Sequence, residues 1–136
     1  MMAIIQVGLE LPPLLEQPTT RQLVMYAGAS QDFYEIHYDQ SFALEHGLPG
    51  VIVHGLLKAA WLCKCVTRWA GPEAFITRIS CEYRGLDLVG EPYEIGGRVV
   101  EATRKADGQH VEVEVWGADS RGKKTTLGSI VVLIPE

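Results

Sequence analysis

The 136-residue chain has little of what several classes of protein depend on. Its three cysteines, Cys63, Cys65 and Cys81, are too few and too unsuitably spaced for a disulfide framework or a zinc knuckle. Twelve basic side chains against seventeen acidic ones give a formal net charge of −5, which argues against a nucleic-acid-binding protein. No apolar run approaches the ~20 residues that a membrane span needs. Free thiols, and an N-terminus without a basic start, are typical of a cytoplasmic protein that lacks a signal peptide.

What the chain does contain suits one globular core. Hydrophobic residues make up 47% of the sequence, and the mean hydropathy is +0.08. The length is enough for one domain and too short for two, and the sequence has no repeat, low-complexity tract or linker. We therefore expect a single domain over residues 1–136.

The first half of the chain predicts short elements. Residues 3–9, AIIQVGL, have the composition of a short strand, which we expect Pro12 and Pro13 to end. Thr19 or Thr20 is a suitable N-cap for a helix over residues 21–29. A short helix is expected near residues 39–46, between segments rich in glycine and proline.

Residues 56–70, LLKAAWLCKCVTRWA, predict a long and largely buried helix. Its polar residues fall on one half of the helical wheel, and the other half is apolar or small, which is wider than the stripe of a surface helix. The polar residues are Lys58, Lys64, Thr67 and Arg68. Gly71 and Pro72 are expected to end this helix.

The remaining sequence predicts a meander of antiparallel strands over residues 74–85, 92–104, 110–119 and 124–134. Valines at 111, 113 and 115 alternate with glutamates at 112 and 114, which indicates one buried and one solvated face. A long buried helix and a long antiparallel meander predict an α+β fold, with a curved sheet wrapped around the helix.

Residues 31–55, between the two main helices, hold three of the four histidines. Asp32 and His37 are five residues apart, a spacing that a helix or a strand would separate and a turn would bring together. An aspartate beside a histidine orients the imidazole and adjusts its pKa, and such a pair can activate water and deliver a proton. His54 and Gly55 begin the long helix, where free N–H groups favour negative charge. The Gly55 N–H is therefore a candidate donor to a carbonyl oxygen that gains charge during a reaction.

Each of these residues also has a purely structural interpretation. Asp32 alone is an ordinary turn residue, Gly55 alone an ordinary packing glycine, and His54 an ordinary hydrogen-bonding partner within the turn. His46 is interpreted as a polar residue at a helix end, with Gly47 closing that end. The spacings of the three histidines match no familiar metal site, so no metal is expected.

Residues 26–57, YAGASQDFYEIHYDQSFALEHGLPGVIVHGLL, resemble the signature of the MaoC-like dehydratases, which include the R-specific enoyl-CoA hydratases. The matching positions, in the order and spacing of that signature, are Tyr26, Asp32, Ile36, His37, His54, Gly55 and Leu56. The rest of the chain resembles the family in layout only, as a hotdog fold.

The resemblance implies reversible hydration of a trans-2-enoyl thioester, usually of coenzyme A, to a (3R)-3-hydroxyacyl thioester. Asp32 and His37 would share the water that adds to C3 and would protonate C2, and the Gly55 N–H would polarise the thioester carbonyl. His54 would support these groups from behind, and Tyr34 would line the pocket. No redox cofactor or metal is implied. The family resemblance and the sheet edge that a lone subunit leaves open both imply a homodimer or larger oligomer, or a heteromer with a related hotdog subunit.

The sequence departs from the signature at three positions. Gln31 stands where the family has glycine, Tyr34 where it has asparagine, and Glu35 where it has proline. These departures support one alternative to an active hydratase, a non-catalytic partner subunit of a heteromeric hydratase. A hotdog acyl-CoA thioesterase is a second alternative, because it would share the fold and the thioester substrate.

Overall fold

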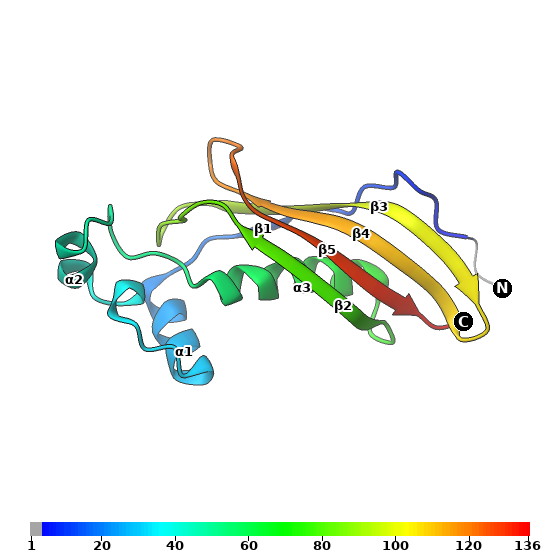
Figure 1. The fold of residues 1–136 in the computed structure, drawn as a ribbon, viewed down its shortest axis with the longest axis horizontal. Helices are drawn as coiled ribbons and strands as arrows, with labels where there is room; N and C mark the ends of the chain where they lie inside the picture. The colour runs from blue at the N-terminus through cyan, green and yellow to red at the C-terminus, as the bar shows by residue number, and fades with distance from the viewer. Residues whose placement is uncertain (1–3) are drawn as a thin grey trace.

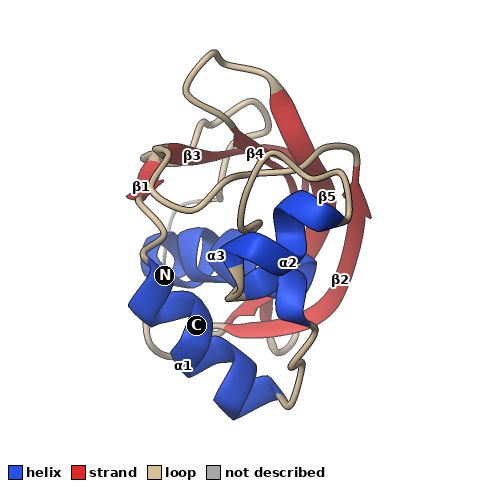
Figure 2. Ribbon diagram, turned by 90° about the vertical axis from the view of Figure 1, so that its left-hand side faces the viewer, coloured by secondary structure: helices blue, strands red, loops and turns tan. Residues whose placement is uncertain are grey.

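The computed structural model describes residues 4–136, and in it a five-stranded antiparallel sheet curves around one long helix (Figures 1 and 2). The helices are α1 (Thr20–Ser30), α2 (Gln40–Glu45) and α3 (Gly55–Ala70), with a 3₁₀ turn over Glu35–His37. The strands are β1 (Leu14–Glu16), β2 (Phe75–Tyr83), β3 (Tyr93–Lys105), β4 (Gly108–Ala118) and β5 (Lys124–Ile134). This is the predicted α+β arrangement.

Helix α3 lies against the concave face of the sheet, and the buried side chains between them form the core (Figure 2). The three alternating valines of β4 are fully buried, and Leu62 and Val66 of α3 are fully buried as well. Each such side chain contributes roughly 1.5–3 kcal/mol when removed from water. The predicted alternation in β4 and the predicted burial of the long helix are therefore confirmed.

Short polar contacts begin the smaller helices. The Thr19 side chain accepts a hydrogen bond from the Gln22 N–H at 3.1 Å, which confirms the expected cap of α1. Asp39 caps α2 in the same manner, accepting from the Phe42 N–H at 3.0 Å. Both caps satisfy N–H groups that have no partner within the helix. None of the helices within residues 4–136 is long and apolar enough to cross a membrane.

The predicted strand at residues 3–9 is wrong for residues 4–9, and residue 3 lies outside the described residues. The Leu9 N–H donates to the Gln6 carbonyl in a turn, and Gly8 has a φ of 90°. A positive φ breaks the extended conformation that a strand needs. The first strand, β1, instead follows Pro12 and Pro13.

The four long strands do not form one continuous meander. The sheet order is β1-β3-β4-β5-β2, so β2 pairs with β5 at the opposite edge from β1. Residues 84–92 therefore cross from one side of the sheet to the other. This crossover passes the beginning of α3, because the Val53 N–H donates to the Asp87 carbonyl at 2.8 Å.

Lys58 also departs from the amphipathic interpretation of α3. Lys64 and Arg68 are exposed and Thr67 is half-buried, but Lys58 is only 2% exposed. Its ammonium group is buried because Asp87, from the crossover, pairs with it at 2.8 Å. Burying such an ion pair costs solvation free energy, and the helical wheel does not reveal which lysine is buried.

Candidate active site

The chain turns sharply after α1 and brings the predicted residues together. Gln31 ends the helix in the left-handed conformation, with a φ of 64°, and its side-chain Nε2 donates to the Gly28 carbonyl at 2.7 Å. Glycine adopts this conformation without steric cost, which explains why the resembled signature has glycine here. Gln31 preserves the turn despite the substitution.

Asp32 directly follows this turn, and His37 ends the 3₁₀ turn that comes next. The distance from Asp32 Oδ2 to His37 Nε2 is 3.9 Å, which is too long for a direct hydrogen bond and short enough for one water molecule beside them to bond both atoms. The His37 side chain is 9% exposed and that of Asp32 is 46% exposed. The pair therefore has one anchored member and one that is open to an incoming molecule.

The ring of His37 is fixed by a backbone contact. Its Nδ1 lies 2.8 Å from the Ile52 carbonyl, and the Ile52 N–H donates to the Ile36 carbonyl at 3.1 Å. A carbonyl oxygen only accepts, so Nδ1 carries a proton, and Nε2, which faces Asp32, is the nitrogen that bears the lone pair when the ring is neutral. The imidazole is thus held in the tautomer that accepts a proton from water.

His54 lies behind this pair and is fully buried. Its ring stacks on that of His37 at a centroid distance of 3.8 Å, and its Nε2 donates to the Asp32 carbonyl at 3.4 Å. Tyr26 packs edge-on against the same ring at 4.8 Å. Burial, followed by the neighbouring His37, lowers the pKa of His54 below its usual 6.5, which favours the neutral ring. His54 Nδ1 is buried and has no hydrogen-bond partner within residues 4–136.

Gly55 begins α3 beside Tyr83 of β2. No side chain among residues 4–136 caps this helix start, so its first N–H groups remain available to an acceptor from outside. A Cβ atom on Gly55 would lie 3.3 Å from the Tyr83 ring, which is a tight contact. The absence of a side chain therefore keeps the helix start accessible between Tyr83 and the His54 turn.

Tyr34 stands next to the pair and is 50% exposed. Its ring is perpendicular to the His37 ring at 6.4 Å, and its backbone N–H donates to Asp32 Oδ1 at 3.4 Å. Tyr34, which stands where the signature has asparagine, thus still donates a hydrogen bond to the Asp32 carboxylate through its backbone N–H. Its half-exposed ring lies beside His37, and its contact with a substrate stays a prediction.

Asp32, His37 and His54 each offer one ligand atom, and these atoms lie within 4.8 Å of one another. The two imidazole rings are stacked and nearly parallel, with an interplanar angle of 21°. Ring lone pairs lie in the ring planes, so stacked rings do not direct them at one ion. One nitrogen of each ring also already faces a backbone carbonyl. This geometry does not fit a metal ion.

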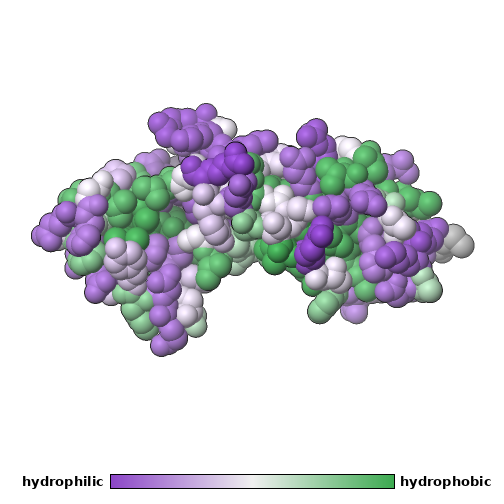
Figure 3. All heavy atoms as spheres, viewed as in Figure 1, coloured by the Kyte–Doolittle hydropathy of each residue, from purple (hydrophilic) through white to green (hydrophobic). Residues whose placement is uncertain are grey.

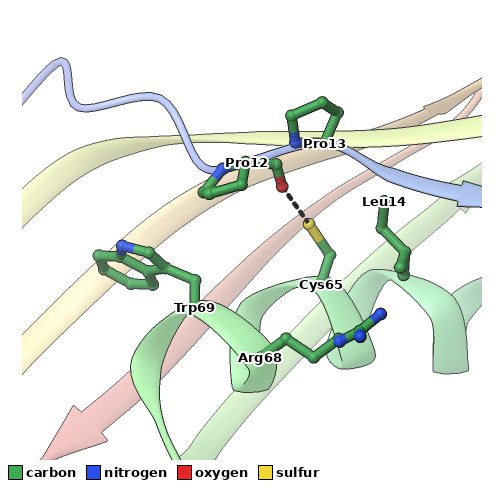
Figure 4. A pocket seen from close by; sticks show the side chains of 6 residues that line it. All are labelled: Pro12, Pro13, Leu14, Cys65, Arg68 and Trp69. Atoms are coloured by element: carbon green, nitrogen blue, oxygen red, sulfur yellow. Dashed lines mark hydrogen bonds between the residues drawn. The ribbon is translucent and has the colours of Figure 1, made fainter.

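The other histidines lie outside this site. His46 stacks on Phe42 and bonds the Phe42 carbonyl, and His110 pairs with Asp107. A cavity of about 280 Å³ lies further along α3, where Cys65 Sγ donates to the Pro12 carbonyl at 3.8 Å (Figure 4). Cys65 is ten residues, or roughly 15 Å, from Gly55 along the helix. This cavity is therefore not the space around Asp32 and His37.

The sequence interpretation missed Ile52, Asp87 and Tyr83. Ile52 acts through its carbonyl, which no side-chain pattern identifies. Asp87 lies in a short connection between two predicted strands, and Lys58 was placed on the polar half of its helix, so no pattern indicated that the two form a buried pair. Tyr83 belongs to β2, which pairs with β5 and not with β3, the next strand along the chain.

The sequence profile of the MaoC-like domain matches residues 10–121, which is most of the chain. The chain belongs to the MaoC-like domain family. It is 32% identical over 123 residues to the 3-oxo-4,17-pregnadiene-20-carboxyl-CoA hydratase beta subunit of Mycobacterium tuberculosis, and the match covers 88% of this chain and 90% of that protein.

Solved structures in the same family share the hotdog fold. The chain matches the ChsH1–ChsH2 complex of Mycobacterium tuberculosis with a TM-score of 0.84, 26% identity, and coverage of 95% of this chain and 98% of the other. It matches the (R)-hydratase of A. caviae with a TM-score of 0.87, 21% identity, and coverage of 96% and 98%. The predicted hotdog fold and the resemblance to the MaoC-like dehydratases are both confirmed.

Proposed function

We propose that this MaoC-like domain hydrates trans-2-enoyl-CoA thioesters, and in reverse dehydrates (3R)-3-hydroxyacyl-CoA. The observation that carries this proposal is the 3.9 Å separation of Asp32 Oδ2 and His37 Nε2, together with the Ile52 carbonyl that fixes the proton on His37 Nδ1. Both groups can accept a proton, and at this separation one water molecule can hydrogen-bond to both. General acid–base catalysis needs a proton acceptor within hydrogen-bond reach of the water.

In the proposed reaction the shared water attacks C3 of the enoyl group. One of its protons passes to the Asp32–His37 pair, and its oxygen becomes the C3 hydroxyl. The electrons of the C2–C3 double bond move toward the thioester carbonyl, and the pair then returns a proton to C2. Atoms balance without a redox cofactor or a metal, because water is the only co-reactant.

In this proposal the start of α3 polarises the thioester carbonyl. The N–H of Gly55 is free of a side-chain cap, and the helix dipole adds partial positive charge there. A thioester carbonyl held by this N–H would be stabilised as it becomes an enolate oxygen. Tyr83, packed over Gly55, would shape the space for that carbonyl.

The substrate class follows from the same features and from the named relative. The relative acts on a coenzyme A thioester of a steroid side chain. Asp32 and Tyr34 are about half-exposed in the single chain, so a substrate can reach both side chains. We propose a coenzyme A thioester as substrate, with a carrier-protein thioester as the competing carrier.

A second hotdog subunit is proposed to cover the β2 edge. Ile79 and Tyr83 are paired with Ile130 and Thr126 of β5, and so lie on the helix side of the sheet, yet each remains more than 40% exposed. Figure 3 shows hydrophobic surface at the centre of the view, where Figure 1 places α3 and β2. An open, apolar edge is a liability unless another chain covers it.

The second candidate function is that of a non-catalytic subunit paired with such a partner. The 32% identical relative is a beta subunit, and one similar structure is a complex of two proteins. A chain with this likeness could serve as the non-catalytic member of such a pair. The presence of Asp32, His37 and Gly55 in one arrangement favours the catalytic member instead.

The proposal is tested by incubating the purified protein with crotonyl-CoA and with a steroid-side-chain enoyl-CoA. Loss of the enoyl absorbance and formation of the (3R)-alcohol, resolved by chiral chromatography, are expected. Release of free coenzyme A without hydration would identify a thioesterase. Inactivity on both substrates, alone and with a related hotdog subunit, would favour the non-catalytic member. Light scattering is expected to give at least a dimer, and a fully active monomer would contradict the proposed interface.

A further inference from the structure

A buried ion pair lies one turn into α3 from the proposed site. Lys58 Nζ donates to Asp87 Oδ2 at 2.8 Å and to the Gly85 carbonyl at 3.0 Å. Thr125 Oγ1 donates to the same Asp87 oxygen at 2.7 Å. The side chains of Lys58 and Asp87 are 3% and 5% exposed. One helix residue, one crossover residue and one residue of β5 therefore meet in a closed polar cluster.

This cluster holds the crossover, residues 84–92, against the segment that enters α3. The Val53 N–H donates to the Asp87 carbonyl at 2.8 Å, and the Val89 N–H donates to the Val51 carbonyl at 3.1 Å. Ile52 lies between these two bonds and forms an isolated bridge with Leu88. Its carbonyl is the one that fixes the proton on His37 Nδ1. A chain of hydrogen bonds and one strand bridge thus joins Lys58 to the imidazole.

Stability alone does not account for this pair. Two charges removed from water lose solvation, and replacing a buried ion pair by uncharged residues is often neutral or stabilising. The pair does, however, impose one geometry, because the ammonium group must satisfy Asp87 and Gly85 together. A constraint of that kind is useful where a carbonyl must be held to a fraction of an ångström.

We propose that Lys58 and Asp87 are positioning residues for the His37 imidazole. Through residues 85–89 they hold the Ile52 carbonyl where it keeps His37 in the Nδ1–H tautomer, with Nε2 free to accept a proton. The effect on rate rests on the proposed hydratase function, whereas the effect on the tautomer does not.

The test removes both charges together, in Lys58→Met with Asp87→Asn. We expect the melting temperature to stay within about 5 °C of wild type, because no buried charge is left unpaired. We expect kcat for crotonyl-CoA to fall by about 10–100-fold, the scale of a small misplacement of a catalytic group, with KM changed less than about threefold. In ¹⁵N spectra recorded without substrate, His37 should show a mixture of tautomers in place of Nδ1–H alone.

Lys64→Met is the matched control. Lys64 is on the same helix and pairs with Glu16 at 2.6 Å, but its side chain is 49% exposed and does not touch residues 51–55 or 85–89. The control should retain the kcat and the His37 tautomer of wild type. A control that loses the tautomer to the same extent would overturn the proposal, since the effect would then not be specific to the buried pair.

A folded double variant with wild-type kcat and a pure Nδ1–H tautomer would overturn the positioning role. If the double variant does not fold, Thr125→Val decides, because it removes one bond to Asp87 and keeps both charges. A folded Thr125→Val with unchanged kcat and tautomer would also overturn the proposal. If the wild-type protein hydrates no enoyl-CoA, only the proposed function is contradicted. The comparison of His37 tautomers then still tests the role of Lys58 and Asp87.

Discussion

Strand β4 and the segment of residues 31–55 are held in place by different kinds of interaction. β4 pairs with β3 on one side and β5 on the other along nearly its whole length, and its valines are fully buried. Residues 31–55 depend on single hydrogen bonds between distant residues, such as His37 to Ile52 and His54 to Asp32. In the strand many equivalent contacts contribute to its position, whereas in the segment a single hydrogen bond fixes the orientation of each histidine ring.

The difference predicts that stability and activity separate along the chain. Damage to β4 should lower the free energy of unfolding in proportion to the apolar area lost, while the folded fraction keeps its chemistry. Damage to the segment should alter the chemistry with less change in stability, because Asp32 is partly exposed and the segment contributes few side chains to the main core. Four predictions test this separation.

The largest expected effect is on the Asp32–His37 pair. Asp32→Asn or His37→Ala should each lower kcat by about 10²–10⁴, because each removes one half of a shared proton acceptor. The double variant should be little worse than either single variant, since the two residues act as a unit. Steady-state kinetics on crotonyl-CoA, with thermal unfolding measured alongside, checks both statements. Full activity in either single variant would remove the assignment.

The second effect concerns Gly55. Gly55→Val should lower kcat by roughly 10²–10³, the scale of one lost oxyanion donor, because the side chain would crowd both the thioester and the Tyr83 ring. Some loss of stability is expected from a β-branched residue at a helix start. Tyr83→Leu is the control for displacement of the ring. If Tyr83→Leu alone reproduces the loss, the ring and not the N–H is the sensitive group.

The third effect lies in the sheet. Val113→Ala should lower the free energy of unfolding by about 2–3 kcal/mol, because it leaves a cavity beneath α3. The kcat of the folded protein should change little. Glu114→Ala, on the opposite and exposed face, should change the free energy of unfolding by less than about 0.5 kcal/mol. Urea unfolding and kinetics on the same samples measure both. A large loss of kcat in folded Val113→Ala would contradict the predicted separation of stability in the strand from activity in the segment.

The smallest effect is a pH dependence that comes from His54. Burial lowers the pKa of this imidazole in the native protein, so below pH 6.5 the unfolded chain takes up a proton that the native chain does not. The free energy of unfolding should therefore fall as the pH is lowered from 6.5 toward the native pKa. Urea unfolding at several pH values should show a shallower slope in His54→Gln than in wild type. An unchanged slope would mean that another group is responsible.

Much of the fold could be predicted from local patterns. The period of the apolar residues located α3 within one residue of its observed start, and the alternation of valine and glutamate gave the inner face of β4. The strand at residues 3–9 failed because apolar composition does not reveal the positive φ of Gly8. The position of β2 beside β5 also could not be predicted, since pairing between distant strands leaves no local signature.

The site was predictable as a set of residues and not as a geometry. The spacing of Asp32 and His37 excluded regular structure and so indicated a turn. The tautomer of His37 depends on a carbonyl fifteen residues away, and the burial of Lys58 depends on an acid twenty-nine residues away. Such contacts are fixed only when the crossover meets the start of α3. Activity by Asp32 and His37 and contact by Tyr34, His54 and Gly55 remain predictions.

The place of β2 in the sheet has a consequence for synthesis of the chain. β2 ends at Tyr83, but its only partner within the described residues, β5, begins at Lys124, about 40 residues later. At a translation rate of roughly 5–20 residues per second, β2 and its apolar side chains wait about 2–8 seconds for that partner. During this interval the nascent chain exposes an unpaired strand, which chaperones or a neighbouring nascent chain would meet first. A ribosome stalled just before β5 should therefore yield a chain that is captured by chaperones, whereas one stalled well beyond Glu136 should not.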